Sequence, residues 1–175
     1  MAEAPRVWAL LGRRAGDNRQ VLTLAEAAGL PFEAKPLRFN PGRALPTLLR
    51  RGSLHTLTLE SRALVAPPWP DVVIAAGKRS APIALWIRMA SGGRTRLVHV
   101  GRPWAPLSWF DRVVTTAQYG LPARANVIRN TLPLAHAPAE AEAIPPALAA
   151  LPSPRLVLLA GGSSRPLMLD AAEAR

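Results

Sequence analysis

Short apolar runs alternate with amphipathic segments along the first 130 residues of the chain. The apolar runs predict buried strands at residues 6–11, 32–37, 71–76, 96–100, 112–115 and 126–129. Apolar positions at helical spacing predict helices at 18–28 and 81–90, and a short helix is expected around 46–51. Because parallel strands need a crossover of about a dozen residues, this alternation predicts an α/β fold, a Rossmann-like parallel sheet flanked by helices.

The character of the chain changes after Thr131. Six prolines stand among alanines between residues 133 and 154, a composition typical of an exposed linker. The apolar run 155–160 then predicts another strand, and Asp170 and Glu173 have the spacing of a helix-capping box. We expect a Rossmann-like domain at 1–132, a Pro/Ala-rich linker at 133–154 and, at 155–175, the first strand and loop of a truncated second domain. The other arrangement is that the last strand joins the first sheet.

Composition excludes several kinds of site. The chain has no cysteine, which rules out a disulfide scaffold, an iron–sulfur cluster, a thiolate zinc site and a cysteine nucleophile. Its three histidines, His55, His99 and His136, are isolated in the sequence, so a His-based metal site is not expected. No cofactor is expected either. No apolar segment approaches the roughly 18 residues of a membrane span, and no signal peptide is visible. The expected location is the cytoplasm.

The formal net charge of +11 admits nucleic acid, an anionic membrane or an anionic substrate as a partner. All but Lys35 and Lys78 of the 22 basic residues are arginine, which indicates a compositional bias of the source proteome. The basic residues stand singly or in pairs and never form the run of five to eight that marks a nucleic-acid tail. We therefore expect most of the basic side chains to lie on a solvated surface, and nucleic acid is the least favoured partner.

The first candidate site follows the first predicted strand. Ligands of open parallel sheets bind at the carboxyl ends of the strands, and a helix start offers free N–H groups to an anion. The residues of this loop that we assign to a binding cleft are Gly12, Arg13, Gly16, Asn18 and Gln20. Asp17 is the only carboxylate in a candidate loop, and it is the candidate general base. The structural alternative is that Asp17 and Gln20 form a capping box.

A second candidate site follows the strand at 71–76. Its residues are Gly77, Lys78, Arg79 and Ser80. Ser80 has the position of a helix N-cap, with Pro82 in the first turn. Cations at a helix start oppose its dipole, so Lys78 and Arg79 favour a bound anion.

Two further segments carry candidate chemistry. Small residues directly after the last predicted strand suit a phosphate or diphosphate, and they are Gly161, Gly162, Ser163 and Ser164. Gln118 and Tyr119 follow the strand at 112–115, so they fall at the same edge of the sheet. Between these segments, Trp104, Leu107, Trp109 and Phe110 form an apolar cluster. Core packing is the favoured reading of that cluster, and contact with a membrane or a partner is the alternative.

Several segments together resemble one family. The run from Gly12 to Leu30, the run from Pro70 to Ala84 and the run from Gly101 to Pro122 are similar in this order to the mitochondrial fission family of "elongated mitochondria" proteins. The N-T-L-P-L segment from Asn130 and the G-G-S-S segment from Gly161 also fit the family. The family is longer than this chain and looks like GT-B glycosyltransferases, whose two Rossmann-like halves bind acceptor and nucleotide sugar.

The resemblance implies a nucleotide-sugar-dependent transferase. By that likeness residues 161–164 would face the donor diphosphate, and the loops at 12–20, 77–80 and 118–119 would line the acceptor side. The competing function is a non-enzymatic adaptor, the role of the plant members, which would dock a protein or an anionic membrane through the basic and Trp-rich surface. In that case the chain is expected at the inner face of a membrane.

Overall fold

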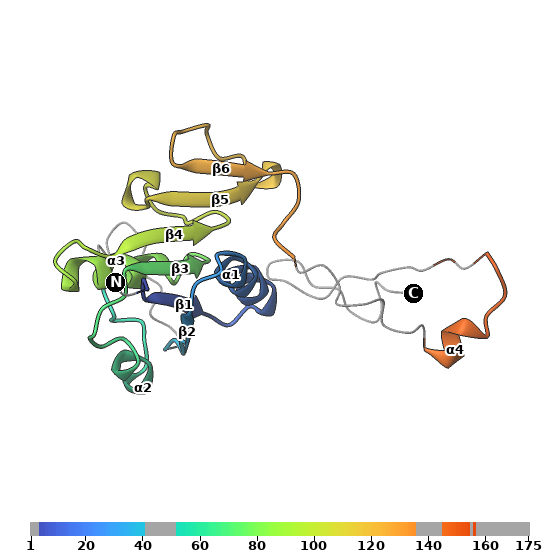
Figure 1. Ribbon diagram of the computed structural model, residues 1–175, viewed down its shortest axis with the longest axis horizontal. Helices are drawn as coiled ribbons and strands as arrows, with labels where there is room; N and C mark the ends of the chain where they lie inside the picture. Colours follow the sequence, from blue (N-terminus) through green and yellow to red (C-terminus); the bar gives the residue numbers. More distant parts are fainter. Residues whose placement is uncertain (1–3, 41–51, 136–144, 155, 157–175) are drawn as a thin grey trace. The chain divides into compact units, whose positions relative to one another are not determined.

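The computed structural model describes residues 4–40, 52–135, 145–154 and 156 (Figure 1). The chain divides into two compact units, Met1–Ala137 and Pro138–Arg175. In the described part of the second unit, α4 spans Pro146–Ala149 and is exposed. Of the predicted strand at 155–160 only Leu156 is described, and its side chain is exposed. The predicted helices at 46–51 and after Asp170 lie outside the described residues.

A parallel sheet forms the centre of the first unit. Its six strands are β1 (Val7–Leu11), β2 (Phe32–Pro36), β3 (Val72–Ala76), β4 (Arg96–Val100), β5 (Arg112–Thr116) and β6 (Val127–Asn130). They lie in the order β2-β1-β3-β4-β5-β6, and every neighbouring pair is parallel (Figure 1). The chain runs to one side of β1 for β2 and to the other side for β3, so the topological switch point lies between β1 and β3. The predicted Rossmann-like α/β fold is confirmed.

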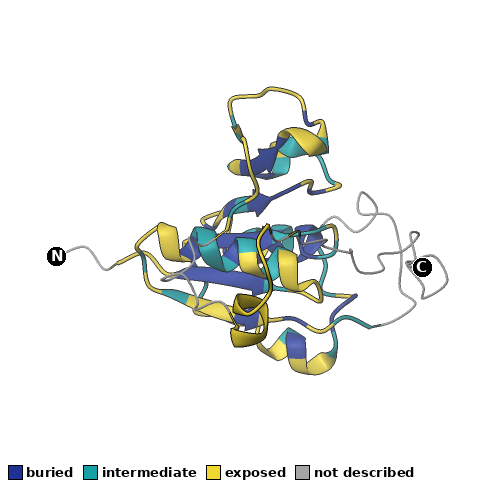
Figure 2. Ribbon diagram, turned by 90° about the vertical axis from the view of Figure 1, so that its right-hand side faces the viewer, coloured by how far each residue is buried: buried dark blue, intermediate teal, exposed yellow. Residues whose placement is uncertain are grey.

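The two longest described helices cover opposite faces of the sheet. Alternate residues of a strand point to opposite faces, and the core divides accordingly. Helix α1 (Ala15–Ala27) packs Val21 and Ala25 with Val7, Ala9 and Ile74. Helix α3 (Ala81–Ala90) packs fully buried isoleucines against the other face, together with Trp8, Leu10 and Val73. Each such buried isoleucine contributes about 1.5–3 kcal/mol to folding. Figure 2 shows the buried residues concentrated on these central strands.

Irregular loops replace helices beyond β4. The connections from β4 to β5 and from β5 to β6 contain only short 3₁₀ turns, at Leu107–Trp109 and Ala117–Tyr119. On the α3 face these loops supply Phe110 and Leu121 to the core. Helix α1 makes its contacts with β1, β3 and β4, so a different segment borders β5 and β6 on the α1 face. This asymmetry creates the groove described below.

Three tryptophans and a lysine fill the α3 side of the core. The rings of Trp8 and Trp69 meet edge to face with centroids 6.2 Å apart, and Trp69 and Trp86 do so at 5.7 Å. Lys35 is buried on β2, with its ammonium 4.3 Å from the centre of the Trp8 ring and bonded to Glu33. A cation in a largely apolar layer is therefore satisfied by a carboxylate and an aromatic face.

An ionic network ties the amino-terminal edge of the sheet. The Asp111 carboxylate accepts hydrogen bonds from Arg88 of α3, from Arg96 of β4 and from the Leu97 N–H group. Burial acts to raise the pKa of Asp111, but the Leu97 N–H, the Arg96 bond and the charges of both arginines hold that pKa below its ordinary value. Arg88 also donates to the backbone carbonyls of Thr95 and Trp109, so one guanidinium joins α3 to the loops that precede β4 and β5.

The helix starts differ from the sequence prediction. Helix α1 begins at Ala15 rather than Asn18, so Asp17 lies inside the first turn and the predicted capping box with Gln20 is wrong. Ser80 does precede α3, but its side chain caps no N–H group, because its hydroxyl lies against the carbonyls of Ala76 and Gly77. Helix α3 and β4 have the predicted bounds. Among the described helices, none has the length and apolar character needed to cross a bilayer.

Candidate functional site

The loop after β1 is held by a side chain of α1. Asn18 Oδ1 accepts from the Gly12 N–H at 2.7 Å, and its Nδ2 donates to the Gly12 carbonyl at 2.9 Å. The amide thus pairs with both backbone groups of one residue, as a neighbouring strand would do. The intervening residues Arg13 and Gly16 are exposed, and this exposed turn leads into the amino-terminal end of α1.

Asp17 lies at the switch point between β1 and β3. A Cβ placed on Gly77 would lie 3.1 Å from Asp17 Oδ2, and Gly77 has φ +78°, so both space and backbone conformation favour glycine there. The carboxylate also complements the positive end of the α1 dipole. The fold therefore brings together two predicted site residues, Asp17 and Gly77, that are 60 positions apart in the sequence.

The basic residues after β3 have different environments. Lys78 is exposed, whereas Arg79 is half-buried with its guanidinium 5.6 Å from the centre of the Phe39 ring. Phe39 is also the nearest side chain to a Cβ placed on Gly12, at 3.9 Å. The Phe39 ring therefore joins the loops that follow β1 and β3, and it gives Arg79 a partner that needs no bound anion.

A buried histidine lies beneath these loops. His99 of β4 is fully buried, its Nε2 is 3.4 Å from the Gly77 carbonyl, and its ring meets Phe110 edge to face at 5.1 Å. Burial lowers the pKa of His99 from 6.5 to about 4, and backbone groups of Gly77 and Gly101 offset only part of that effect. The imidazole is therefore neutral at physiological pH, and its Nδ1 has no hydrogen-bond partner of normal geometry among the described residues.

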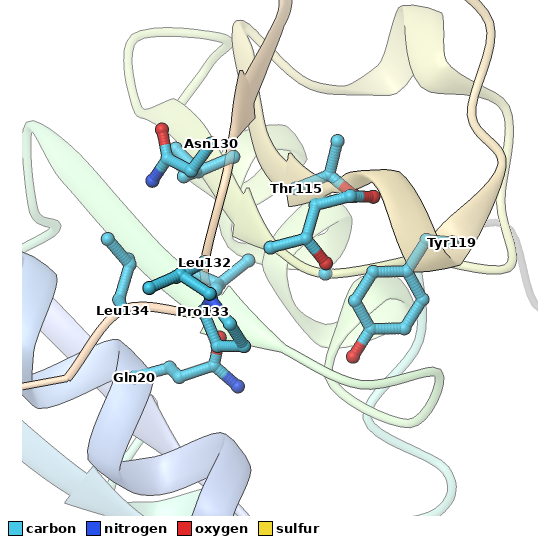
Figure 3. Close-up of a pocket in the computed structure, with 11 residues that line it drawn as sticks. Gln20, Thr115, Tyr119, Asn130, Leu132, Pro133 and Leu134 are labelled. Atoms are coloured by element: carbon cyan, nitrogen blue, oxygen red, sulfur yellow. The ribbon is translucent and has the colours of Figure 1, made fainter.

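A groove opens on the α1 face at the carboxyl ends of β4, β5 and β6. In Figure 3, Gln20 on α1, Tyr119 after β5 and the segment 132–134 after β6 approach it from three sides. Its lining residues are Gln20, Val100, Gly101, Val114, Thr115, Thr116, Tyr119, Asn130, Leu132, Pro133 and Leu134. The groove is small and open to solvent, and it does not enclose a ligand-sized cavity.

The groove contains an unusual hydroxyl. Thr116 is 7% exposed, and its Oγ1 is buried without a hydrogen-bond partner among the described residues. Tyr119 is placed by Gly101, where φ is +76° and a Cβ would lie 3.4 Å from the phenol ring. A Cβ at that distance would be in ordinary van der Waals contact, so the positive φ is what favours glycine at position 101.

The structure gathers some of the predicted residues and separates others. Gln20 and Tyr119 share the groove, while Gly12, Asp17, Asn18, Gly77, Arg79 and Ser80 lie at the switch point. Gln118 is exposed and does not line the groove. Gly161, Gly162, Ser163 and Ser164, the predicted diphosphate site, lie outside the described residues. Among the described residues no three His, Cys, Asp or Glu side chains could hold a metal ion.

The apolar cluster between β4 and β5 serves mainly as core. Phe110 is buried, and Leu107 and Trp109 pack against it within the α3-side core. Trp104 differs, because 60% of it is exposed, its φ is +55° and the Arg102 guanidinium lies 4.5 Å from its ring centre. The predicted core role therefore holds for three of the four residues.

Sequence reasoning missed the residues that shape the groove. Thr116 and Asn130 pair across β5 and β6, and Val100 pairs with Val114 across β4 and β5. One signal was available in the sequence, because the polar Thr115-Thr116 pair ends an otherwise apolar run at the carboxyl end of a strand. The contribution of residues 132–134 had no such signal, since it depends on how the chain returns over the sheet.

Comparison with known proteins gives one informative match. No curated protein and no solved structure matches the chain. A family model described as mitochondrial fission ELM1 matches residues 15–175, which cover helix α1, five of the six strands and the whole second unit. The match also includes the segments after β3, β5 and β6 that form the candidate site. The chain therefore belongs to the mitochondrial fission ELM1 family.

Proposed function

We propose that this chain is a GT-B-like, nucleotide-sugar-dependent glycosyltransferase homologue and that the unit described here is its acceptor side. The observation that carries the proposal is the placement of Asp17 against Gly77 at the switch point, at the same sheet edge as the groove. Ligands of open α/β sheets bind at this position. A carboxylate beside a groove lined by hydroxyl and amide groups suits the activation of an acceptor hydroxyl.

In the proposed glycosyl transfer, Asp17 and the loop at residues 161–164 have separate roles. The acceptor oxygen attacks the anomeric carbon of the donor sugar, the bond from that carbon to the diphosphate oxygen breaks, and its electron pair leaves with the diphosphate. Asp17 takes the proton of the acceptor hydroxyl. In this proposal the backbone N–H groups of residues 161–164, together with arginines, stabilise the charge that develops on the departing diphosphate.

Nucleotide binding is the first test. The melting temperature is measured with and without uridine diphosphate and its sugars, on the longest form that the gene encodes. Ligand at about 100 times its dissociation constant stabilises the native state by about 2.7 kcal/mol, or about 5–10 °C for a protein of this size. If no nucleoside diphosphate changes the melting temperature, the proposal is wrong.

A variant of Asp17, the proposed base, distinguishes nucleotide binding from glycosyl transfer. Asp17→Asn keeps the shape of the side chain, so the uridine diphosphate shift should persist while turnover falls by about 100-fold or more. Glu26→Gln, a carboxylate near the other end of α1, is the matched control and should leave turnover unchanged. Equal turnover of Asp17→Asn and the unaltered chain would remove Asp17 from the mechanism.

An adaptor that docks on an anionic membrane is the second candidate function, and the exposed Trp104 favours it. Its ring carries the Arg102 guanidinium, so an apolar surface and a cation are presented together. Co-sedimentation with vesicles of mixed neutral and anionic phospholipids should fall with Trp104→Ser and not with Leu59→Ser, an apolar residue that is 76% exposed. Trp109 is unsuitable for this test because it packs against the core. Equal binding of both variants would exclude the Trp104 surface.

A further inference from the structure

The carbonyl group of Gly77 is held from inside the fold. Its oxygen accepts a hydrogen bond from the Ser80 hydroxyl at 2.9 Å, and His99 Nε2 lies 3.4 Å from the same oxygen. Ser80 is 6% exposed and His99 is fully buried. A carbonyl oxygen can only accept, so the neutral His99 ring makes this bond with its proton on Nε2. Two buried side chains, one before α3 and one on β4, therefore fix the direction of one peptide group.

Gly77 is also the wall against which the Asp17 carboxylate lies. A Cβ placed on Gly77 would be 3.1 Å from Asp17 Oδ2, closer than ordinary van der Waals contact, so the carboxylate depends on the bare Cα for its present position. Gly77 has φ +78°, a conformation that glycine adopts without steric cost. Glycine also has the greatest backbone freedom of any residue, so this wall keeps its position only with outside support. Ser80 and His99 supply that support.

This contact distinguishes Gly77 from other glycines in the left-handed region. A Cβ placed on four of them would meet nothing within 4 Å, and these are Gly29, Gly92, Gly93 and Gly120. Among the described glycines, Gly77 is the one at which an added Cβ would meet a carboxylate. Its conformation therefore serves the placement of a charged side chain as well as the turn after β3.

We propose that Gly77, Ser80 and His99 are positioning residues for the Asp17 carboxylate. Ser80 and His99 hold the Gly77 peptide, and the Gly77 Cα in turn limits the rotamers that Asp17 can adopt. A side chain that is ordered before the substrate arrives loses less entropy when the reacting groups meet. The catalytic meaning of this placement rests on the proposed function, in which Asp17 is the base, but the placement itself does not.

A matched pair of alanine variants tests the wall. Gly77→Ala and Gly93→Ala add the same methyl group at φ +78° and +83°, so their backbone strain is similar, but only at position 77 would it meet Asp17. The three-bond couplings from the backbone nitrogen and carbonyl carbon of Asp17 to its Cγ measure the χ1 rotamer by NMR. One rotamer should dominate in the unaltered chain and in Gly93→Ala, and Gly77→Ala should lose it as the dominant one.

Variants of Ser80 and His99 test how the wall is held. Ser80→Ala removes the hydroxyl, and Ser91→Ala is the control, because Ser91 is also a buried, hydrogen-bonded serine but lies at the other end of α3. His99→Leu removes the ring donor, and His99→Gln keeps an N–H donor on a side chain of similar reach. Ser80→Ala and His99→Leu should mix the Asp17 rotamers, while Ser91→Ala and His99→Gln should retain the dominant one. Because Ser80→Ala keeps the His99 ring in the core, it decides the matter even where His99→Leu does not fold.

Turnover connects this placement with the proposed transfer. Gly77→Ala should lower kcat with uridine diphosphate sugars by about 10- to 100-fold and leave the donor KM unchanged, because a misplaced base affects the reacting complex rather than donor binding. Gly93→Ala should change neither constant.

Two results would overturn the inference. One is an Asp17 rotamer distribution that is the same in Gly77→Ala as in Gly93→Ala, and the other is an equal effect of Ser80→Ala and Ser91→Ala on that distribution. Failure of the transferase proposal is distinguishable, because the Asp17 rotamers would still respond to Gly77→Ala while no nucleoside diphosphate raised the melting temperature.

Discussion

The two edges of the sheet differ in how some of their buried polar groups are bonded. At the amino-terminal edge, Asp111 bonds to Arg88, Arg96 and a backbone N–H, and Thr95 donates to the Pro70 carbonyl. At the carboxyl edge, the Thr116 hydroxyl and one nitrogen of His99 are buried without described partners. Trp8, Thr56 and Arg62 also hold buried polar atoms without described partners, but of these five residues only Thr116 lines the groove.

This contrast separates stability from binding. Variants at the amino-terminal edge should lower the free energy of unfolding with little effect on ligands. Variants at the carboxyl edge should alter ligands with a smaller effect on unfolding. His99 is the exception that can break this division, because it lies at the carboxyl edge and is buried as a neutral ring.

Lowering the pH should produce the largest change in the free energy of unfolding, because of His99. The pKa of His99 is lowered from 6.5 to about 4, so between these values the unfolded state binds the additional proton. The stabilisation is fully present above pH 6.5 and falls by about 3 kcal/mol as the pH approaches 4. Urea unfolding at a series of pH values measures the decline, and His99→Leu should flatten it in this window. Parallel curves for both proteins would refute the assignment.

The stabilisation by Asp111 at the amino-terminal edge should be lost only at a lower pH than that of His99. The folded-state pKa of Asp111 is lowered, so its stabilisation is present above its ordinary value of 3.8 and disappears as the pH falls below it. Asp111→Ala should therefore destabilise by about 2–3 kcal/mol at pH 7, because it leaves Arg88 and the Leu97 N–H without their partner. Arg96 is 74% exposed, and Arg96→Ala should cost less than about 1 kcal/mol. Equal losses for the two variants would contradict this ranking.

An intermediate effect is expected where α1 holds the loop after β1. Asn18→Ala removes both hydrogen bonds to Gly12 and should cost about 1–2 kcal/mol. Asn18→Asp keeps the acceptor and loses the donor to the Gly12 carbonyl, so the melting temperature should fall between those of Asn18→Ala and the unaltered chain. Identical values for Asn18→Ala and the unaltered chain would show that the loop is held by other contacts.

The smallest change in stability should come from the groove. Thr116→Val replaces a buried hydroxyl without a partner by a methyl group, so the free energy of unfolding should stay within about 1 kcal/mol or rise. Calorimetry of Thr116→Val and Thr56→Val gives the comparison with Asp111→Ala at the other edge. A loss of more than about 2 kcal/mol for Thr116→Val would mean that its hydroxyl stabilises the fold.

Local patterns were sufficient for most of the fold. Helix α3 and β4 have the predicted bounds, because the largely apolar segment of α3 lies between Gly77 and the turn Ser91-Gly92-Gly93, and β4 follows that turn. The start of α1 was missed because Gly16 and Asp17 are typical of turns. In the structure α1 begins at Ala15, and Asn18, inside the helix, bonds to Gly12 in the loop before it.

The site was only partly predictable, since its parts come from distant segments. Gln20 and Asn130, 110 positions apart, line the same groove, and this depends on strand order and on the path of the chain after β6. The loops at 12–20 and 77–80 were identifiable, because the carboxyl ends of parallel strands always gather at one edge. The contact of Arg79 with Phe39 could not be predicted, since Phe39 follows β2 in a region without a clear pattern of apolar and polar residues.

The aromatic residues allow the two halves of this architecture to be observed by spectroscopy without any mutation. The chain contains a single tyrosine, Tyr119, and five tryptophans. Growth with fluorotyrosine would therefore give one ¹⁹F resonance, and that resonance would come from the groove. Fluorotryptophan would give five resonances, of which those of Trp8, Trp69 and Trp86 report on the α3-side core. A ligand that moves the tyrosine signal alone would identify the groove, in one spectrum, as the place where it binds.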